Sequence, residues 1–166
     1  MKRFAFFAAA LLIATPALAV QAPKLKLDSI ANLPVVTMKP YDESADAERD
    51  LAAAFARARK RHTRVLIDMG GNWCGDCVVM ANIFELPEMK PFMKAHFEVV
   101  SVDTGRKNKN MQIPARYGVD LNGGVPAMLV VTADGKPVNP KELSALEDAR
   151  HMTPQALADW LAKWAK

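Results

Sequence analysis

The sequence predicts an α/β fold, and three observations lead to this class. A β-branched and apolar run at residues 65–69 leads into residues 73–77, which read Trp-Cys-Gly-Asp-Cys. After this stretch, apolar residues recur at helical spacing. From residue 64 onward, strand-like and helix-like patterns follow one another in the order β-α-β-α-β-β-α. Alternation of this kind is typical of a sheet covered by helices.

Residues 1–19 have the pattern of a cleaved signal peptide. Lys2 and Arg3 give a charged start, an apolar run follows, and residues 17–19 (Ala-Leu-Ala) form a small-residue cleavage signal. The alternative is a membrane anchor, but an apolar run of about a dozen residues is shorter than the roughly 20 that span a bilayer. No cysteine follows the run, which excludes a bacterial lipoprotein. The sequence therefore predicts export to the periplasm.

The charge of the chain excludes one class of partner. Loss of Lys2 and Arg3 with the leader would lower the formal net charge from +4 to +2. A balance so close to neutral gives no support for nucleic-acid binding.

Residues 20–42 are interpreted as an N-terminal extension, because three prolines interrupt any regular pattern. One short strand is expected there, at residues 35–38. The remaining chain, residues 43–166, is expected to form one domain. Its first element is a helix over residues 45–61 that Ser44 would cap, with an apolar stripe at Leu51, Ala54, Phe55 and Ala58.

A buried strand is expected at residues 64–69, followed by a turn and a helix over residues 74–85. Cys74 and Cys77, the chain's two cysteines, stand at the start of this helix. A disulfide between them would close too short a loop to stabilise the fold appreciably, so reactivity explains the pair better. Helix amides and the helix dipole stabilise a thiolate at such a position. The chemistry indicated is thiol–disulfide exchange.

The later elements are predicted from the same kinds of pattern. They are a helix with an apolar stripe through residues 89–97, a strand at 97–102, a helical turn at 113–117, a strand at 127–132, a hairpin turn at 134–135 leading to a strand at 136–138, and a final helix capped by Thr153 with Pro154 in its first turn.

Together these features resemble the thioredoxin family, over about residues 43–166. Beyond the cysteine spacing, Asp68 lies six residues before Cys74, where the family has its buried acid. Val125 and Pro126 resemble the segment that ends in the family's cis-proline. The resemblance implies a thioredoxin fold, with a central mixed β-sheet flanked by helices.

The resemblance also implies a role for each motif residue. Cys74 would be the nucleophile and Cys77 would resolve the mixed disulfide. Asp68, desolvated beneath the pair, would have a raised pKa and accept the proton of Cys77. Trp73 would shield Cys74, and Val125 would pair its backbone with a substrate strand beside a cis Pro126. The alternatives are an ordinary turn residue for Asp68 and a trans proline at a strand start for Pro126.

Two departures from the family bear on its chemistry. The residues between the cysteines are Gly75 and Asp76, where thioredoxins usually have Gly-Pro. A carboxylate beside the thiols should disfavour the Cys74 thiolate and move the reduction potential toward the reducing side. In addition, residues 120–124 form a longer loop than the corresponding one of thioredoxin, which could narrow the choice of partner.

The sequence thus predicts a periplasmic reductase of protein disulfides that needs no bound cofactor and no metal. Its expected partners are a disulfide-containing protein and a membrane or periplasmic thiol electron donor, and it is expected to be a monomer. A disulfide-donating oxidase and an isomerase are the alternatives within this class. An alternative of another class is a copper(I)-binding protein, in which the cysteine pair is joined by sulfur or imidazole ligands from Met80, Met89, Met93, His96 or His151.

Overall fold

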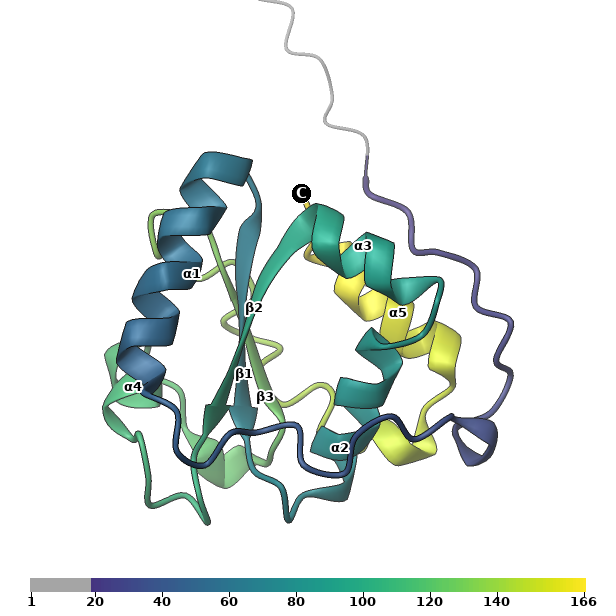
Figure 1. Cartoon of the computed structure of the whole chain (residues 1–166), viewed down its shortest axis with the longest axis horizontal. Helices are drawn as coiled ribbons and strands as arrows, with labels where there is room; N and C mark the ends of the chain where they lie inside the picture. Colours follow the sequence, from purple (N-terminus) through teal and green to yellow (C-terminus); the bar gives the residue numbers. More distant parts are fainter. Residues whose placement is uncertain (1–18) are drawn as a thin grey trace, which may run out of the picture.

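The computed structural model describes residues 19–166 and has an α/β architecture (Figure 1). Within that part of the chain the sheet has three strands, in the order β2-β1-β3. The central strand β1 (Arg64–Gly70) pairs in parallel with β2 (Phe97–Asp103) and antiparallel with β3 (Ala127–Val131). The sheet is therefore mixed, as predicted. Asp68 lies in its middle, opposite Ser101 on β2 and Met128 on β3.

Helices cover both faces of this sheet (Figure 1). One face carries α1 (Ala47–Arg61) and the short α4 (Gln112–Arg116). The other carries α2 (Gly75–Phe84), α3 (Met89–His96) and α5 (Pro154–Lys163). Three 3-10 turns complete the elements: η1 (Ile30–Asn32), η2 (Leu121–Gly123) and η3 (Ala149–His151). None of the helices in residues 19–166 is long and apolar enough to cross a bilayer.

The strands are almost completely buried, which accounts for their nearly continuous apolar sequence. Alternate residues of β1 belong to two hydrophobic clusters. Val65, Ile67 and Met69 contribute to the cluster that includes α1, and Leu66 to the one that includes α2, α3 and α5. The sheet thus separates two core layers, and the buried Asp68 follows Leu66 by two positions.

The prediction of a strand at residues 136–138 was wrong: an isolated bridge joins Pro137 to Val131, and the Val138 N–H donates to the Val130 carbonyl at 2.9 Å, but no continuous ladder forms. Proline has no backbone N–H to give to a strand ladder. Beyond it, the side chain of the buried Asn139 takes the place of a strand backbone. Its Oδ1 accepts the Val130 N–H at 2.8 Å and its Nδ2 donates to the Met128 carbonyl at 2.8 Å.

The predicted strand at residues 35–38 was also wrong. The Val36 and Thr37 amides donate to Asn82 Oδ1 on α2, at 2.6 and 3.0 Å, so a side chain rather than a strand satisfies them. The extension nevertheless lies along the domain, beside α3, α5 and α2 (Figure 1). Its apolar side chains that pack on the core are Val20, Ala22, Leu25, Leu27, Ile30 and Leu33.

The helix ends agree with prediction except at one cap. Thr153 caps α5 as predicted, accepting the Ala156 amide at 3.2 Å. The predicted cap of α1 was wrong: Asp46, not Ser44, accepts from the amide of Arg49 at 3.0 Å. Ser44 instead bonds to Asp42, so α1 begins at Ala47. The predicted leader, residues 1–19, lies outside the described residues except for Ala19.

Candidate active site

Cys74 and Cys77 form a disulfide at the start of α2. Cys74 is the N-cap residue of the helix, and its Sγ accepts the Cys77 amide at 3.1 Å. The Cys74 amide in turn donates to the Gly71 carbonyl at 3.0 Å, which fixes the turn after β1. In the reduced protein, the same amide and the positive end of the helix dipole would stabilise a Cys74 thiolate.

The two sulfurs differ in their access to solvent. Cys77 is completely buried, whereas Cys74 retains 5% of its surface and lines an open depression of about 350 Å³. The other lining residues come from the turn before α2 and its start, from the loop before β3, and from η3 with its flanks. They include Trp73, Gly75, Asp76, Val125, Glu147 and Arg150. The accessible part of Cys74 is therefore small, and Cys77 has none. Another sulfur can still reach Cys74 first.

Asp68 is buried within the sheet, with 1% of its surface exposed. Burial raises its pKa to about 7, and a hydrogen bond from Tyr41 acts in the opposite direction. The Tyr41 hydroxyl donates to Asp68 Oδ1 at 2.7 Å, while Oδ2 is buried without a hydrogen-bond partner. A carboxyl group with such a pKa can accept or release a proton near neutral pH.

Gly70 brings this carboxyl–hydroxyl pair close to the disulfide. A Cβ at Gly70 would lie 2.5 Å from the Tyr41 hydroxyl oxygen and 2.7 Å from Cys77 Sγ. The two atoms therefore flank one point at the end of β1, where only glycine leaves room for both. The Tyr41 hydroxyl, which donates to Asp68, thus lies close to the buried sulfur.

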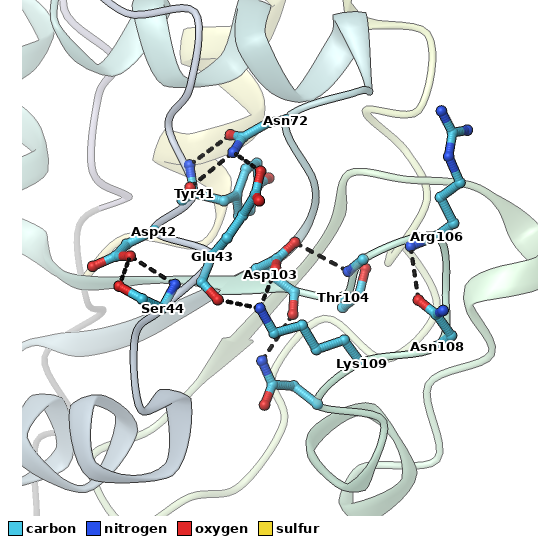
Figure 2. Close-up of polar contacts among 12 residues, drawn as sticks. Tyr41, Asp42, Glu43, Ser44, Asn72, Asp103, Thr104, Arg106, Asn108 and Lys109 are labelled. Carbon is cyan, nitrogen blue, oxygen red and sulfur yellow. Dashed lines mark hydrogen bonds and ion pairs between the residues drawn. The ribbon is translucent and has the colours of Figure 1, made fainter.

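Tyr41 comes from the extension, and sequence reasoning did not identify it as a site residue. It is 2% exposed. Asn72 holds its backbone from both sides: Asn72 Oδ1 accepts the Tyr41 amide at 3.0 Å, and Nδ2 donates to the Tyr41 carbonyl at 2.9 Å (Figure 2). The available signal, a lone aromatic residue in an irregular segment of mixed composition, is weak.

A second set of contacts joins the extension to the end of β2. Lys109 bonds to Asp103 Oδ2 at 2.7 Å and to the Glu43 carbonyl, bridging the two segments (Figure 2). Thr104, next after Asp103, donates from its amide and its hydroxyl to the Gly70 carbonyl, at 2.7 and 2.9 Å. The C-terminal ends of β1 and β2 are therefore held together beside the disulfide.

Val125 and Pro126 lie beside Cys74. The peptide bond between them is cis, and the Val125 carbonyl oxygen is 3.4 Å from Cys74 Sγ. The preceding loop contains η2, and Gly124 there has a φ of 120°. A Cβ at Gly124 would lie 1.8 Å from Glu147 Oε2, so the segment that contains Glu147 packs tightly against the loop.

Trp73 is the large exposed side chain beside Cys74, with 45% of its surface accessible. Its indole N–H donates to the Gly105 carbonyl at 2.6 Å, and the Arg106 guanidinium lies 5.2 Å from its ring centroid. The ring is thereby held at the rim of the depression, where it can contact a bound segment.

Asp76 is paired with a cation that the sequence did not reveal. Its carboxylate is 4% exposed and lies 2.9 Å from the Arg150 guanidinium; it also accepts the Arg150 amide at 2.9 Å. Arg150 belongs to η3, where no element had been predicted. No local pattern marks such a pairing. The effect predicted for Asp76 on the Cys74 thiolate must therefore be assigned to the Asp76–Arg150 ion pair as a whole.

The candidate copper ligands are spread over the protein. Met80, Met89 and Met93 are buried in the cluster with α3 and α5, whereas the cysteines belong to the other cluster. His96 contacts the Lys166 carbonyl and His151 contacts Asp148. In residues 19–166, no group of three or more His, Cys, Asp or Glu side chains is placed to hold a metal ion.

Comparisons with known proteins agree with this geometry. A thioredoxin-like family model matches residues 46–133. A thioredoxin from Alicyclobacillus acidocaldarius subsp. acidocaldarius is 29% identical over 109 residues, which cover 66% of this chain and 92% of that protein. The crystal structure of a disulphide isomerase from Xylella fastidiosa Temecula1 is similar with a TM-score of 0.71 and 35% identity. That match covers 75% of this chain and 95% of the other.

Proposed function

The chain belongs to the thioredoxin-like family, and we propose that within it the protein is a periplasmic reductase of protein disulfides. The family and the cysteine pair make it a thiol–disulfide oxidoreductase. The direction of electron flow and the compartment are the proposed part. Residues 1–19 support the compartment through their signal-peptide pattern.

The proposed reaction transfers two electrons in two exchanges. The Cys74 thiolate attacks a substrate disulfide, forming a Cys74–substrate disulfide and releasing one substrate thiolate, which takes up a proton. Cys77 then loses its proton and attacks Cys74 Sγ. The Cys74–Cys77 bond forms, the bond to the substrate breaks, and the second substrate thiol leaves. A thiol donor, proposed to be membrane-bound or periplasmic, returns the pair to the dithiol.

One observation supports the proposal that the protein reduces disulfides through a rapid resolving step. That step needs a base for a buried thiol, and Asp68, with a pKa near 7, accepts a hydrogen bond from Tyr41, whose hydroxyl lies close to the buried Cys77 sulfur. A base poised at that pH favours rapid release of the reduced substrate. The same group, when protonated, also assists the reverse step, in which a substrate thiolate opens the disulfide, so the reduction potential decides the direction of electron flow.

Isomerisation is the second candidate, because the similar structure with 35% identity is that of a disulphide isomerase. An isomerase needs Cys74 to attack a wrongly paired disulfide and to leave without being oxidised. Rapid attack by Cys77 competes with that outcome, so the same Asp68 base makes isomerisation the less favoured candidate.

The reduction potential of the Cys74–Cys77 pair tests the proposal. The protein lacking residues 1–19 is equilibrated with glutathione or dithiothreitol, and the dithiol fraction is measured. A value near that of thioredoxin, roughly −270 mV, supports a reductase, whereas one near roughly −120 mV refutes it. A second assay separates isomerisation from reduction by measuring the activity that scrambled ribonuclease regains with the wild type and with Cys77→Ala. Activity regained with Cys77→Ala favours the isomerase.

A further inference from the structure

We propose that Tyr41 is a positioning residue for the disulfide chemistry, whose hydroxyl holds the Asp68 carboxyl ready to receive the proton of Cys77. This inference rests on the proposed function and deepens it. Tyr41 lies outside residues 46–133, the part of the chain that the family model matches. The extension would thus supply a positioning residue of the site, in addition to packing on the core.

The two Asp68 oxygens are used differently. Oδ1 accepts the Tyr41 hydroxyl at 2.7 Å, and Oδ2 has no partner. An unpaired buried oxygen is costly, so its retention calls for a role. With Oδ1 occupied, Oδ2 is the atom left to take a proton.

The protonation state of Tyr41 is set by its surroundings. Burial, followed by the charge of Asp68 and the hydrogen bond to it, raises the pKa of Tyr41 well above its usual range. The hydroxyl therefore keeps its proton at physiological pH and remains a donor to Asp68 throughout the cycle. Such a donor stabilises the ionised carboxylate, which is the form that acts as the base.

Tyr41 is held by the turn that carries the nucleophile. Asn72 binds both backbone groups of Tyr41 and also donates to Glu43 Oε1 at 2.9 Å (Figure 2). Trp73 and Cys74 follow directly in the chain. The distance between the hydroxyl and the cysteine pair is therefore set by adjacent residues of one turn, as a positioning role requires.

The proton balance of the resolving step follows from this arrangement. The Cys77 S–H bond breaks, its electron pair forms the bond to Cys74 Sγ, and the proton goes to Asp68 Oδ2. The Cys74–substrate bond breaks, and its electron pair leaves on the substrate sulfur. Asp68 is 1% exposed and borders an open cavity of about 560 Å³ beneath residues 36–40, which is the proposed route by which the proton then reaches water.

The charged groups around Asp68 are few. Lys39 from the extension, Glu85 at the end of α2 and Lys90 from α3 line the same cavity. Asp103, at the end of β2, contributes to the raised pKa of Tyr41. In the reduced protein Cys77 is the remaining titrating group. Tyr41 is the neighbour that donates a hydrogen bond to the carboxyl, so it should dominate the response to mutation.

The test follows the resolving step by itself. The reduced protein lacking residues 1–19 is mixed with 5,5′-dithiobis(2-nitrobenzoate) in a stopped-flow instrument from pH 5 to pH 9. The first equivalent of released thiolate reports attack by Cys74, and the second reports attack by Cys77. Tyr41→Phe removes only the hydroxyl. We expect it to slow the second phase about fivefold at pH 7. The rising limb in the plot of the second-phase rate against pH should move up by about one pH unit. The first phase, an internal control, should stay unchanged.

A double-mutant comparison separates positioning from a general packing effect. Asp68→Asn should slow the second phase and remove the rising limb. In the Asp68→Asn background, Tyr41→Phe should then change the second phase by less than about twofold. An unshifted limb in Tyr41→Phe would overturn the proposal. So would equal slowing by Tyr41→Phe in both backgrounds, because Tyr41 would then act independently of Asp68.

A second measurement covers the case in which Tyr41→Phe fails to fold. In the unmutated oxidised protein, the ¹³C signals of Asp68 Cγ and Tyr41 Cζ should titrate with one shared midpoint near pH 7. A Tyr41 signal that does not follow Asp68 would overturn the proposal. None of these outcomes depends on the reduction potential, so a failed reductase assignment would be recognised separately.

Discussion

Arg150 forms an ion pair with Asp76 at 2.9 Å, although the two residues are 74 positions apart in the chain. Asp76 lies in the first turn of α2, two residues after Cys74. An unpaired carboxylate at this place would oppose a thiolate on Cys74. Since the Arg150 side chain is 56% exposed, solvent screens part of the interaction. The pair as a unit should set how easily Cys74 ionises.

Changing each partner of this pair should move Cys74 reactivity in opposite directions. Arg150→Met leaves the carboxylate uncompensated, so alkylation of Cys74 by iodoacetamide should shift to higher pH by about half a unit to one unit. Asp76→Asn should shift it to lower pH. Both variants are measured with Cys77→Ala, so that one thiol remains. The variant with both Arg150→Met and Asp76→Asn should return close to the starting pH dependence of alkylation. Shifts of the two single variants in the same direction would contradict the role assigned to the ion pair.

Asp68 should make the stability of the oxidised protein depend on pH. Its pKa is raised to about 7 in the folded protein, against an ordinary value of 3.8. Between these values the folded state keeps a proton that the unfolded state has lost. Stability from this group is thus fully present below about pH 4 and is lost as pH rises through 7, by about 4 kcal/mol in total.

Asp68→Asn removes this dependence, because the amide does not titrate. The variant and the wild type should have similar free energies of unfolding at pH 4, apart from a constant offset. At pH 8 the variant should gain about 4 kcal/mol relative to the wild type. Guanidinium unfolding of the oxidised proteins across this range measures the difference. A difference that does not change with pH would mean that the Asp68 pKa is not raised.

The elements that position the site follow largely from local sequence. Three of them have a signature within a few residues. These are the mostly apolar run of β1, the CxxC pair at the start of α2 and the Thr153–Pro154 cap of α5. The family resemblance then identified Asp68 and Pro126, and the structure buries Asp68 in β1 and places the cis Val125–Pro126 bond beside Cys74.

The contacts that sequence reasoning missed join distant segments through side chains. Tyr41 reaches Asp68, Arg150 reaches Asp76, and neither pairing leaves a periodic signal in the chain. The wrong strand predictions have the same origin. At residues 35–38 and 136–138 the pattern suggested strands, but the side chains of Asn82 and Asn139 bind backbone groups there or in the neighbouring strand. A buried amide can replace a strand partner, and composition alone does not show where it will.

Asn139 should therefore contribute strongly to stability. Asn139→Ala would leave the Val130 N–H and the Met128 carbonyl without partners in the core, which should cost about 2 to 4 kcal/mol. Asn122→Ala, at an exposed position near the site, is the matched control and should change stability by less than about 0.5 kcal/mol. Chemical denaturation of both variants measures the costs. Equal effects would show that the side-chain bridge is not important.

Gly70 should be intolerant of even one added carbon. A Cβ there would lie 2.5 Å from the Tyr41 hydroxyl and 2.7 Å from Cys77 Sγ, so Gly70→Ala must displace one of them. We expect a loss of about 1 to 3 kcal/mol in stability. Gly123→Ala is the matched control, because its nearest neighbour would be Ser144 Oγ at 3.9 Å.

The kinetic effect of Gly70→Ala distinguishes which group moves. If Tyr41 is displaced, attack by Cys77 should slow while the reaction of Cys74 is unchanged, and the pH dependence should resemble that of Tyr41→Phe. If Cys77 is displaced, the reduction potential of the pair should change as well, because the geometry of the disulfide is altered. A variant with unchanged stability, potential and rates would contradict the close approach of the hydroxyl and the sulfur at this point, on which the linkage between Asp68 and Cys77 depends.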